Sequence, residues 1–142
     1  MEELQEKSLN RETVSIELSA KPVPFEELDP PVRLAIECAA EKKAFGIAAL
    51  DLREIASFTE FFVIASTANQ RQAQAVADEI GDKLRSQLGT RPIRTEGYSA
   101  AEWILLDYGD FVFHVFNGEA REFYDLERLW RDARKVALPE SI

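Results

Sequence analysis

The fold of this chain is decided by one stretch, Trp103-Ile-Leu-Leu-Asp-Tyr-Gly-Asp-Phe-Val-Phe-His-Val-Phe116, in which two apolar runs flank a short polar segment. Large apolar residues on both sides of a polar turn predict a β-hairpin. The turn is Asp107-Tyr-Gly-Asp110, and its glycine is free to take the positive φ that tight turns need. The predicted strands span residues 103–106 and 111–116, and they form the first part of a β-sheet.

Three further strands are predicted upstream of this hairpin. Residues 47–52 and 60–65 are short and dense in apolar side chains, as strands covered on both faces are. Residues 91–96 predict a strand at the edge of the sheet, because Pro92 has no N–H to donate to a central ladder. Together with the hairpin, these segments make a sheet of about five strands.

A first helix is predicted before these strands. It begins at Asp29, whose side chain can cap the helix, and two prolines occupy the first helical positions. It runs to about Phe45, where Gly46 can close it in the left-handed conformation.

A second helix is predicted after residue 67. The segment 67–72 offers two alternative capping pairs, Thr67 with Gln70 or Asn69 with Gln72. Gly89 ends this helix. Its apolar residues recur at helical spacing and predict a buried stripe of Ala73, Val76, Ala77, Ile80 and Leu84.

A final helix is predicted after the hairpin, from the helical spacing of Phe123, Leu126, Leu129, Trp130, Ala133 and Val136. The resulting order of elements predicts the α/β class, with a mixed sheet of about five strands flanked by helices. Residues 1–28 show no sustained apolar period and predict a flexible, acidic N-terminal extension. The domain then spans residues 29–138, and residues 139–142 form a short tail.

Composition limits the kind of protein this can be. A length of 142 residues suits one domain with a tail. One cysteine, Cys38, excludes an internal disulfide. The first residues lack the basic start and apolar core of a signal peptide, and the longest apolar run, Phe61 to Ala65, is too short to span a bilayer. The sequence therefore predicts a cytoplasmic, soluble protein without a membrane partner.

The negative charge is concentrated around the hairpin. The chain has a net charge of −9, and the segment from Glu96 to Glu127 carries eight carboxylates against a single cation, Arg121. Negative potential combined with large aromatic side chains favours docking on a basic protein. It disfavours direct recognition of nucleic acid, because phosphates would be repelled. An isolated acidic stretch is more often ordinary solvated charge, so the aromatic residues decide the interpretation.

Two aromatic residues of the hairpin are the predicted anchors of such an interface. Tyr108 lies in the turn, where we expect its side chain to project into solvent. Trp103 begins the first strand, where it can be either an anchor or a core residue. Truncation of an interface tyrosine or tryptophan often costs about 2 kcal/mol or more. The acidic neighbours Asp107 and Asp110 would add selectivity for a cationic partner, whereas Trp130 is expected in the core.

An enzymatic alternative uses three aspartates. Asp51, Asp107 and Asp110 lie at the ends of predicted strands, where two-metal phosphoryl-transfer sites place their carboxylates. No glycine-rich phosphate loop precedes a helix, however, so no catalytic residue, metal or cofactor is predicted. His114 is the only histidine, and its place inside a strand favours a hydrogen bond in the core over a catalytic role.

These motifs give the chain a family resemblance. Residues 101–116 and 121–130 are similar to the ribosomal silencing factor family, also called the Iojap-like family. Upstream, Ala49-Leu-Asp-Leu52 and Thr59-Glu-Phe-Phe-Val-Ile-Ala-Ser66 resemble the same family. The likeness extends from about Val32 to Ala137 and makes residues 29–138 a silencing-factor domain.

The resemblance implies a fold, a partner and a function. It implies a nucleotidyltransferase-like fold without the catalytic signature. It also implies binding to the large ribosomal subunit through a protein on its joining face, the fourteenth in that subunit's numbering. Occupying this face blocks the small subunit and represses translation. By position, the residues that match the family's ribosome-contacting segment are Trp103, Asp107, Tyr108, Gly109 and Asp110.

Two alternatives stay open at this point. One is a nucleotidyltransferase-like, magnesium-dependent enzyme built on the three aspartates. The other is a self-associating module, because exposed aromatic surfaces also make homodimers.

Overall fold

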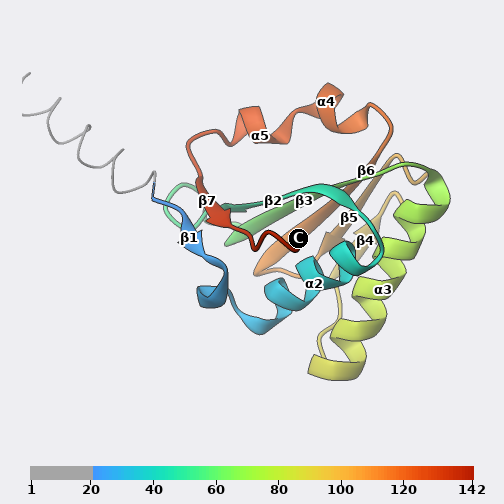
Figure 1. The fold of residues 1–142 in the computed structure, drawn as a ribbon, viewed down its shortest axis with the longest axis horizontal. Coiled ribbons are helices and arrows are strands. Elements are labelled where there is room, and N and C mark those ends of the chain that lie inside the picture. The colour runs from blue at the N-terminus through green and yellow to red at the C-terminus, as the bar shows by residue number, and fades with distance from the viewer. Residues whose placement is uncertain (1–20) are drawn as a thin grey trace, which may run out of the picture.

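The computed structural model describes residues 21–142, and the first twenty residues of the predicted acidic extension lie outside the described part. The fold is α/β, as predicted, with a single mixed sheet in the described residues (Figure 1). The strands are β1 (Val23–Pro24), β2 (Phe45–Asp51), β3 (Phe61–Thr67), β4 (Arg94–Glu96), β5 (Trp103–Asp107), β6 (Phe111–Asn117) and β7 (Arg134–Ala137). The helices are α2 (Pro30–Glu41), α3 (Gln70–Leu88), α4 (Ala120–Tyr124) and α5 (Leu126–Leu129), with a 3-10 turn η1 (Phe25–Glu27).

The sheet has seven strands rather than the predicted five, in the order β1-β7-β2-β3-β6-β5-β4. Its centre is the parallel pair of β3 and β6, whose register runs from Phe61 opposite Phe111 to Thr67 opposite Asn117. Both strands are almost entirely buried, because α2 and α3 cover one face and α4 and α5 run across the other (Figure 1). The two additional strands, β1 and β7, were not predicted.

The predicted hairpin is confirmed. β5 pairs antiparallel with β6, with Trp103 opposite Phe116 and Asp107 opposite Val112. Gly109 takes a φ of 85° in the turn, the conformation for which glycine was expected there. β4 lies beyond β5 at the edge of the sheet, as the proline before it predicts.

α3 follows the sequence rules closely. Of the two capping pairs, the structure uses the second: Asn69 Oδ1 accepts a hydrogen bond from the Gln72 backbone N–H at 2.8 Å. Gly89 ends the helix with a φ of 64°. The predicted buried stripe is confirmed at each of its positions, Ala73, Val76, Ala77, Ile80 and Leu84.

The predicted end of the first helix is wrong. α2 stops at Glu41, and Lys43 takes the left-handed conformation with a φ of 66°. Phe45 already belongs to β2, where it pairs with Ser66 of β3. Strand pairing therefore overrides helical continuation over residues 42–46. Asp29 does occupy the capping position, but its side chain makes no capping hydrogen bond.

The predicted final helix is also wrong in its second half. Asp125 takes a left-handed φ of 47° and separates α4 from α5. Residues 134–137 leave the helical path and form β7, which lies between β1 and β2. Val136, expected on a helix, is thus buried in the sheet. The edge of β2 offers unpaired backbone groups that β7 satisfies, and sequence periodicity does not reveal this.

The folded part begins earlier than predicted. Val23 is 1% exposed and pairs with Val136, and Leu28 is 3% exposed. Residues 23–28 therefore belong to the domain rather than to the extension, because they cover the β7 edge and contribute to the core. Ile142 packs against the same core, so the expected tail is part of the fold as well.

The sheet separates two apolar clusters. The larger one lies between the sheet and α2 and α3, and includes Ile36, Ile80, Phe113 and Tyr108. The smaller one lies on the other face, beneath α4 and α5, and includes Phe62 and Phe116 among its buried residues. Within residues 21–142, no helix is long and apolar enough to cross a bilayer.

Gly46 gives a prediction about stability. It has a φ of 59°, and a Cβ there would lie 2.9 Å from Arg121 Nη1, which donates a hydrogen bond to Ser66 Oγ. Gly46→Ala should therefore lower the free energy of unfolding by about 1–2 kcal/mol, through backbone strain and displacement of the guanidinium.

The matched control is Gly81→Ala in α3. Nothing lies within 4 Å of the Cβ that it would add. Replacing a helix-interior glycine by alanine should raise the free energy of unfolding by about 1 kcal/mol. Urea denaturation of both variants measures the two opposite signs, and equal changes would contradict this account of Gly46.

Candidate functional site

Aromatic side chains gather on the sheet face that lies beneath α4 and α5. Trp103 of β5 is half-buried, and its ring centroid lies 5.2 Å from that of Phe116. The ring of Tyr124 of α4 also contacts Trp103, with a centroid distance of 4.6 Å. Phe123 meets Tyr124 edge-on at 5.1 Å. Trp103 thus contacts one buried ring and one exposed ring, which restricts its position and leaves part of it accessible.

A hydrogen bond to a buried histidine fixes the orientation of the Trp103 side chain. Its indole Nε1–H donates to Nδ1 of His114 at 3.0 Å. His114 is only 3% exposed, and its burial lowers its pKa to about 4. The imidazole is therefore neutral near pH 7, which leaves Nδ1 free to accept. The predicted core hydrogen bond of His114 is confirmed.

The apolar surface extends beyond Trp103. Phe58 lies 5.8 Å from Trp130 and 5.9 Å from Phe62, measured between ring centroids. Of the side chains on this side, Phe123 is 80% and Leu129 is 70% exposed. We call this surface the aromatic face and define it by Phe58, Trp103, Phe123, Tyr124, Leu129 and Trp130. Exposed large side chains at this density favour a protein partner.

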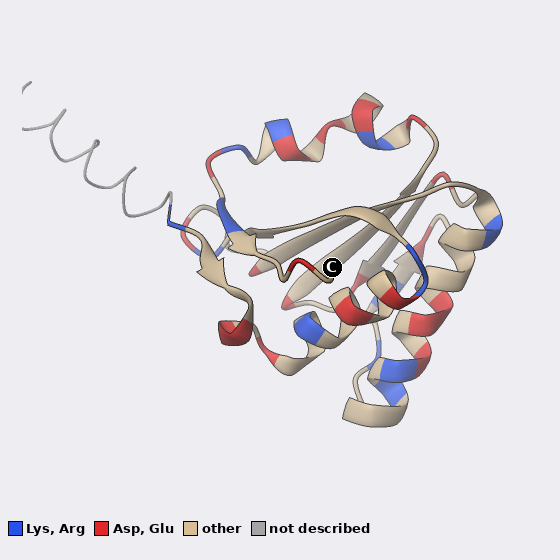
Figure 2. Cartoon of the chain, viewed as in Figure 1, with Lys and Arg blue, Asp and Glu red and all other residues tan. Residues whose placement is uncertain are grey.

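The charge on the aromatic face is mixed. Carboxylates are exposed along α4 and α5, and Figure 2 shows basic positions alternating with them. Arg121 is engaged with Glu127, whose Oε1 accepts from Nε at 2.9 Å. Arg128 and Arg131 add exposed positive charge. The acidic stretch inferred from the sequence thus ends at residue 127, and basic side chains follow it on the same surface.

The structure does not bring the predicted anchors together. Trp103 and Asp107 share one face of β5 but occupy its opposite ends, which a strand of five residues separates by about 14 Å. Side chains alternate along a strand, so Tyr108 points to the other face. The turn and the tryptophan therefore form separate parts of the molecular surface.

The expected exposure of Tyr108 is wrong. It is 8% exposed, and its ring stacks on that of Phe111 with a centroid distance of 4.8 Å. The physical reason is that the residue continues the alternation of β5 and fills the core beneath the helices. Among the turn residues only Asp110 is exposed, and Asp107 and Gly109 are intermediate.

The turn is held in place by its own hydrogen bonds. Asp107 Oδ1 accepts from the Gly109 backbone N–H at 2.8 Å, and its Oδ2 lies 3.4 Å from Arg94 Nε. The Thr59 hydroxyl donates to the Gly109 carbonyl at 2.8 Å. These contacts give Asp107 a structural role, as expected for an aspartate that begins a turn.

The three aspartates do not converge. Asp51 is buried and bound on both carboxylate oxygens by Arg53, at 2.9 Å and 2.8 Å. Burial opposes its ionisation, but the hydrogen bonds and charge of Arg53 outweigh it, so the pKa of Asp51 is lowered. Asp51 pairs with Phe61, which pairs with Phe111, so two strand spacings of about 4.8 Å lie between β2 and β6. No three acidic or metal-binding side chains in the described part of the chain could hold a metal ion.

Sequence reasoning missed the exposed residues of α4 and the segment before β3. Phe123 was predicted on the apolar stripe of one continuous final helix, and no role was predicted for Phe58. The break at Asp125 turns Phe123 outward, and aspartate tolerates the left-handed conformation better than most residues do. Asp125 is therefore a local signal for this break.

Comparisons with known proteins agree on one family. The family described as "Ribosomal silencing factor during starvation" matches residues 26–142. A ribosomal silencing factor from Halalkalibacterium halodurans is 39% identical over 107 residues, which cover 75% of this chain and 91% of the relative. A crystal structure of a protein from Chromobacterium violaceum is similar, with a TM-score of 0.69 at 32% identity, over 78% of this chain and 88% of that chain.

A more distant relative is named for an assembly role. The Mus musculus protein named mitochondrial assembly of ribosomal large subunit protein 1 is 28% identical over 102 residues. The match covers 70% of this chain and 44% of the relative, so it concerns less than half of the mouse protein.

His114 makes the free energy of unfolding depend on pH. In the unfolded chain it binds a proton with a pKa near 6.5, and in the folded chain near 4. Stability is therefore fully present above pH 6.5 and falls as the pH drops toward 4. Between pH 7 and 5 the loss should be about 2 kcal/mol.

Urea denaturation at pH 7, 6 and 5 tests this dependence. His114→Gln keeps an acceptor for the Trp103 N–H but does not titrate, so it should lose most of the pH dependence in this range. The range lies above the pKa of most carboxyl groups, which limits their contribution. An unchanged slope in His114→Gln would contradict the role assigned to His114.

Proposed function

This chain belongs to the ribosomal silencing factor family, and we propose that it represses translation by binding the large ribosomal subunit and keeping the small subunit away. Membership of the family supports a ribosome-associated role in silencing translation. The name of the mouse relative supports the large subunit as the partner. We propose that the contact is made with a protein on the joining face, the fourteenth in that subunit's numbering, and that the chain acts in the cytoplasm.

The observation that carries this proposal is the contact between the half-buried ring of Trp103 and the exposed ring of Tyr124. Tyr124 is 51% exposed, and its ring contacts Trp103 at 4.6 Å. Buried aromatic rings supply most of the binding energy at many interfaces. Because His114 already holds the indole, little conformational entropy would be lost when a partner covers it.

Mixed charge around these rings suits a basic protein better than bare nucleic acid. Glu102, Glu122 and Asp125 are exposed near the rings in sequence and can face cations of a ribosomal protein. We propose Asp107, Gly109 and Asp110 as peripheral contacts only, because they lie at the far end of the hairpin. Tyr108 is not proposed as a contact, since it is buried.

Steric exclusion requires occupancy and no chemistry. A protein bound to the joining face prevents the small subunit from occupying the same surface, so the effect depends on affinity and on concentration. The enzymatic alternative is not favoured, since no three acidic or metal-binding side chains in the described residues lie where they could hold a metal ion together. The nucleotidyltransferase-like fold and the homodimer stay predictions.

Tyr124→Ala tests the aromatic face. Tyr124 lies on the surface rather than in the core, so the fold should be kept, while affinity for purified large subunits should fall by about tenfold or more. Co-sedimentation through a sucrose cushion measures this, with circular dichroism as the check on folding. Leu88→Ala is the matched control, because Leu88 is 40% exposed at the end of α3. Equal binding of Tyr124→Ala and Leu88→Ala would contradict the proposed face.

Tyr108→Phe tests whether the aromatic face or the turn contacts the large subunit. The Tyr108 hydroxyl is buried, so its removal should leave co-sedimentation unchanged. A loss of binding in the folded variant would instead assign the contact to the turn.

Sucrose gradients of mixed subunits then measure function: the wild-type chain should reduce joined particles, and Tyr124→Ala should not.

A further inference from the structure

The edge of β2 lacks a partner strand over part of its length. β7 pairs with β2 only at Leu50 and Asp51, and its next two residues, Val136 and Ala137, pair with β1. Within residues 21–142, the side of β2 that faces away from β3 therefore carries no strand pairing from residue 45 to residue 49. A sheet edge of this kind presents backbone N–H and C=O groups with which another strand can pair.

A groove with a volume of about 410 Å³ opens at this edge. Consecutive residues of β2, from Ile47 to Leu50, line it together with Val136 of β7 and Trp130. Because side chains alternate along a strand, lining by consecutive residues means that the groove reaches the edge of β2 and not only one of its faces. We call it the edge groove. Most of its lining is apolar, including Ile47, Ala48, Leu50, Trp130, Ala133 and Leu138.

The rim of the edge groove is cationic. Arg131 and Lys135 line it, and both are exposed. Glu127 also lines the groove, but its Oε1 already accepts from Arg121 Nε at 2.9 Å. An open strand edge with an apolar lining and basic side chains fits an extended segment that combines apolar side chains with negative charge.

One segment of this chain has these properties. Residues 13–18, Thr-Val-Ser-Ile-Glu-Leu, alternate polar and apolar side chains, which is the pattern of a strand that buries one face. Thr13, Val14 and Ile16 are β-branched and favour strands. Residues 1–20 carry five carboxylates against two cations, so their charge complements that of the rim. All of them precede the described part of the chain.

The point of attachment brings this segment within reach of the groove. Lys21 lies beside Arg134, whose Nε donates to the Lys21 carbonyl at 3.2 Å, and Arg134 pairs with Asp51 of β2. Two strand spacings separate β1 from β2, which amounts to about 10 Å. Three residue steps, from Leu18 to Lys21, span up to about 11 Å. Leu18 can therefore lie next to β2 near Leu50.

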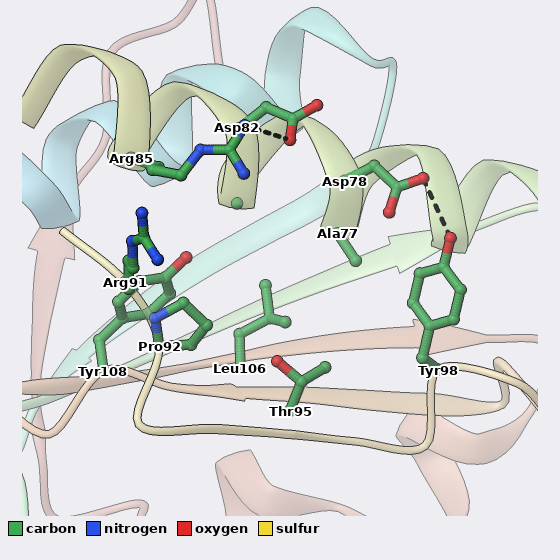
Figure 3. A pocket seen from close by; sticks show the side chains of 11 residues that line it. Ala77, Asp78, Asp82, Arg85, Arg91, Pro92, Thr95, Tyr98, Leu106 and Tyr108 are labelled. Carbon is green, nitrogen blue, oxygen red and sulfur yellow. Dashed lines mark hydrogen bonds and ion pairs between the residues drawn. The ribbon is translucent and has the colours of Figure 1, made fainter. Parts of the chain in front are cut away.

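The groove beside α3 does not offer residues 13–18 a comparable site. It lies between α3 and the segment that leads through β4 to β5 (Figure 3). In the order of the sheet, β5 is five spacings from β1, or about 24 Å, which the three steps before Lys21 cannot span. Polar side chains there also contact one another, since Asp78 Oδ2 accepts from the Tyr98 hydroxyl at 3.0 Å (Figure 3).

We propose that residues 13–18 occupy the edge groove as an added strand of the sheet, parallel to β2, with Val14, Ile16 and Leu18 against its apolar lining. Carboxylates of residues 1–20 would face Arg131 and Lys135. A short covalent link gives such a segment an effective concentration in the millimolar range, which a separate molecule would have to match. Every contact lies within one chain, so the proposal does not rest on the ribosomal role.

Amide hydrogen exchange in the full chain, followed by NMR, tests the proposal. The β2 amides of residues 47–49 that point away from β3 should exchange about tenfold faster or more in Ile16→Asn than in the wild-type chain, because apolar contacts of the added strand are lost. Leu9→Asn is the matched control. It makes a similar change in the same extension, outside the alternating segment, and should exchange like the wild-type chain.

The rim charges give a second readout. Arg131→Gln should raise the same exchange rates by severalfold, whereas Arg128→Gln, at an exposed arginine outside the groove, should not. Added salt should act in the same direction as Arg131→Gln, because it screens the attraction between the extension and the rim. All four variants change exposed residues or residues of the extension, so the fold should be kept, which circular dichroism checks.

Three results would overturn the proposal. One is equal exchange in Ile16→Asn and Leu9→Asn. Another is the absence of nuclear Overhauser contacts between residues 14–18 and Ala48 in the wild-type chain. The third is a loss of protection on dilution, which would assign the groove to the same segment of a second copy rather than to the segment of its own chain.

Discussion

Alternation of side chains along β5 and β6 sends neighbouring residues of the hairpin to opposite faces of the sheet. Trp103 and His114 point to the face beneath α4 and α5, while Tyr108 and Phe113 point to the face beneath α2 and α3. A shift of one residue in this register would exchange the two sets. The pairing of Trp103 with Phe116 therefore determines which aromatic residues can meet a partner.

The aromatic face depends on a neutral histidine. A charged imidazole at position 114 could not accept the indole N–H and would sit unpaired in an apolar cluster. Burial keeps the ring neutral, and the neutral ring orients Trp103. This arrangement stabilises an otherwise adaptable side chain in one position before any partner arrives. Preorganisation of this kind raises affinity without adding contacts.

Local chemistry made much of the fold predictable. The hairpin turn and both ends of α3 follow from Gly109, Asn69 and Gly89, whose conformations are set by neighbours in sequence. The end of α2 and the start of β7 could not be predicted, because they follow from pairing with strands far away in the chain. For the site, the sequence left open whether Trp103 is an anchor or a core residue, and the structure shows it half-buried. The sequence did not indicate Tyr124, which the break at Asp125 exposes. Tyr108 was misplaced because its turn continues the strand alternation.

The two faces place different demands on the same strand. At one end of β5, Trp103 lies partly exposed on a surface that a large partner can cover. Toward the other end, Leu106 and Tyr108 point to the opposite face and pack in the core beneath α2 and α3. A partner on the aromatic face leaves that opposite face uncovered, because the whole thickness of the sheet lies between them. The alternation of side chains along one strand thus separates a residue that can meet a partner from residues that stabilise the core.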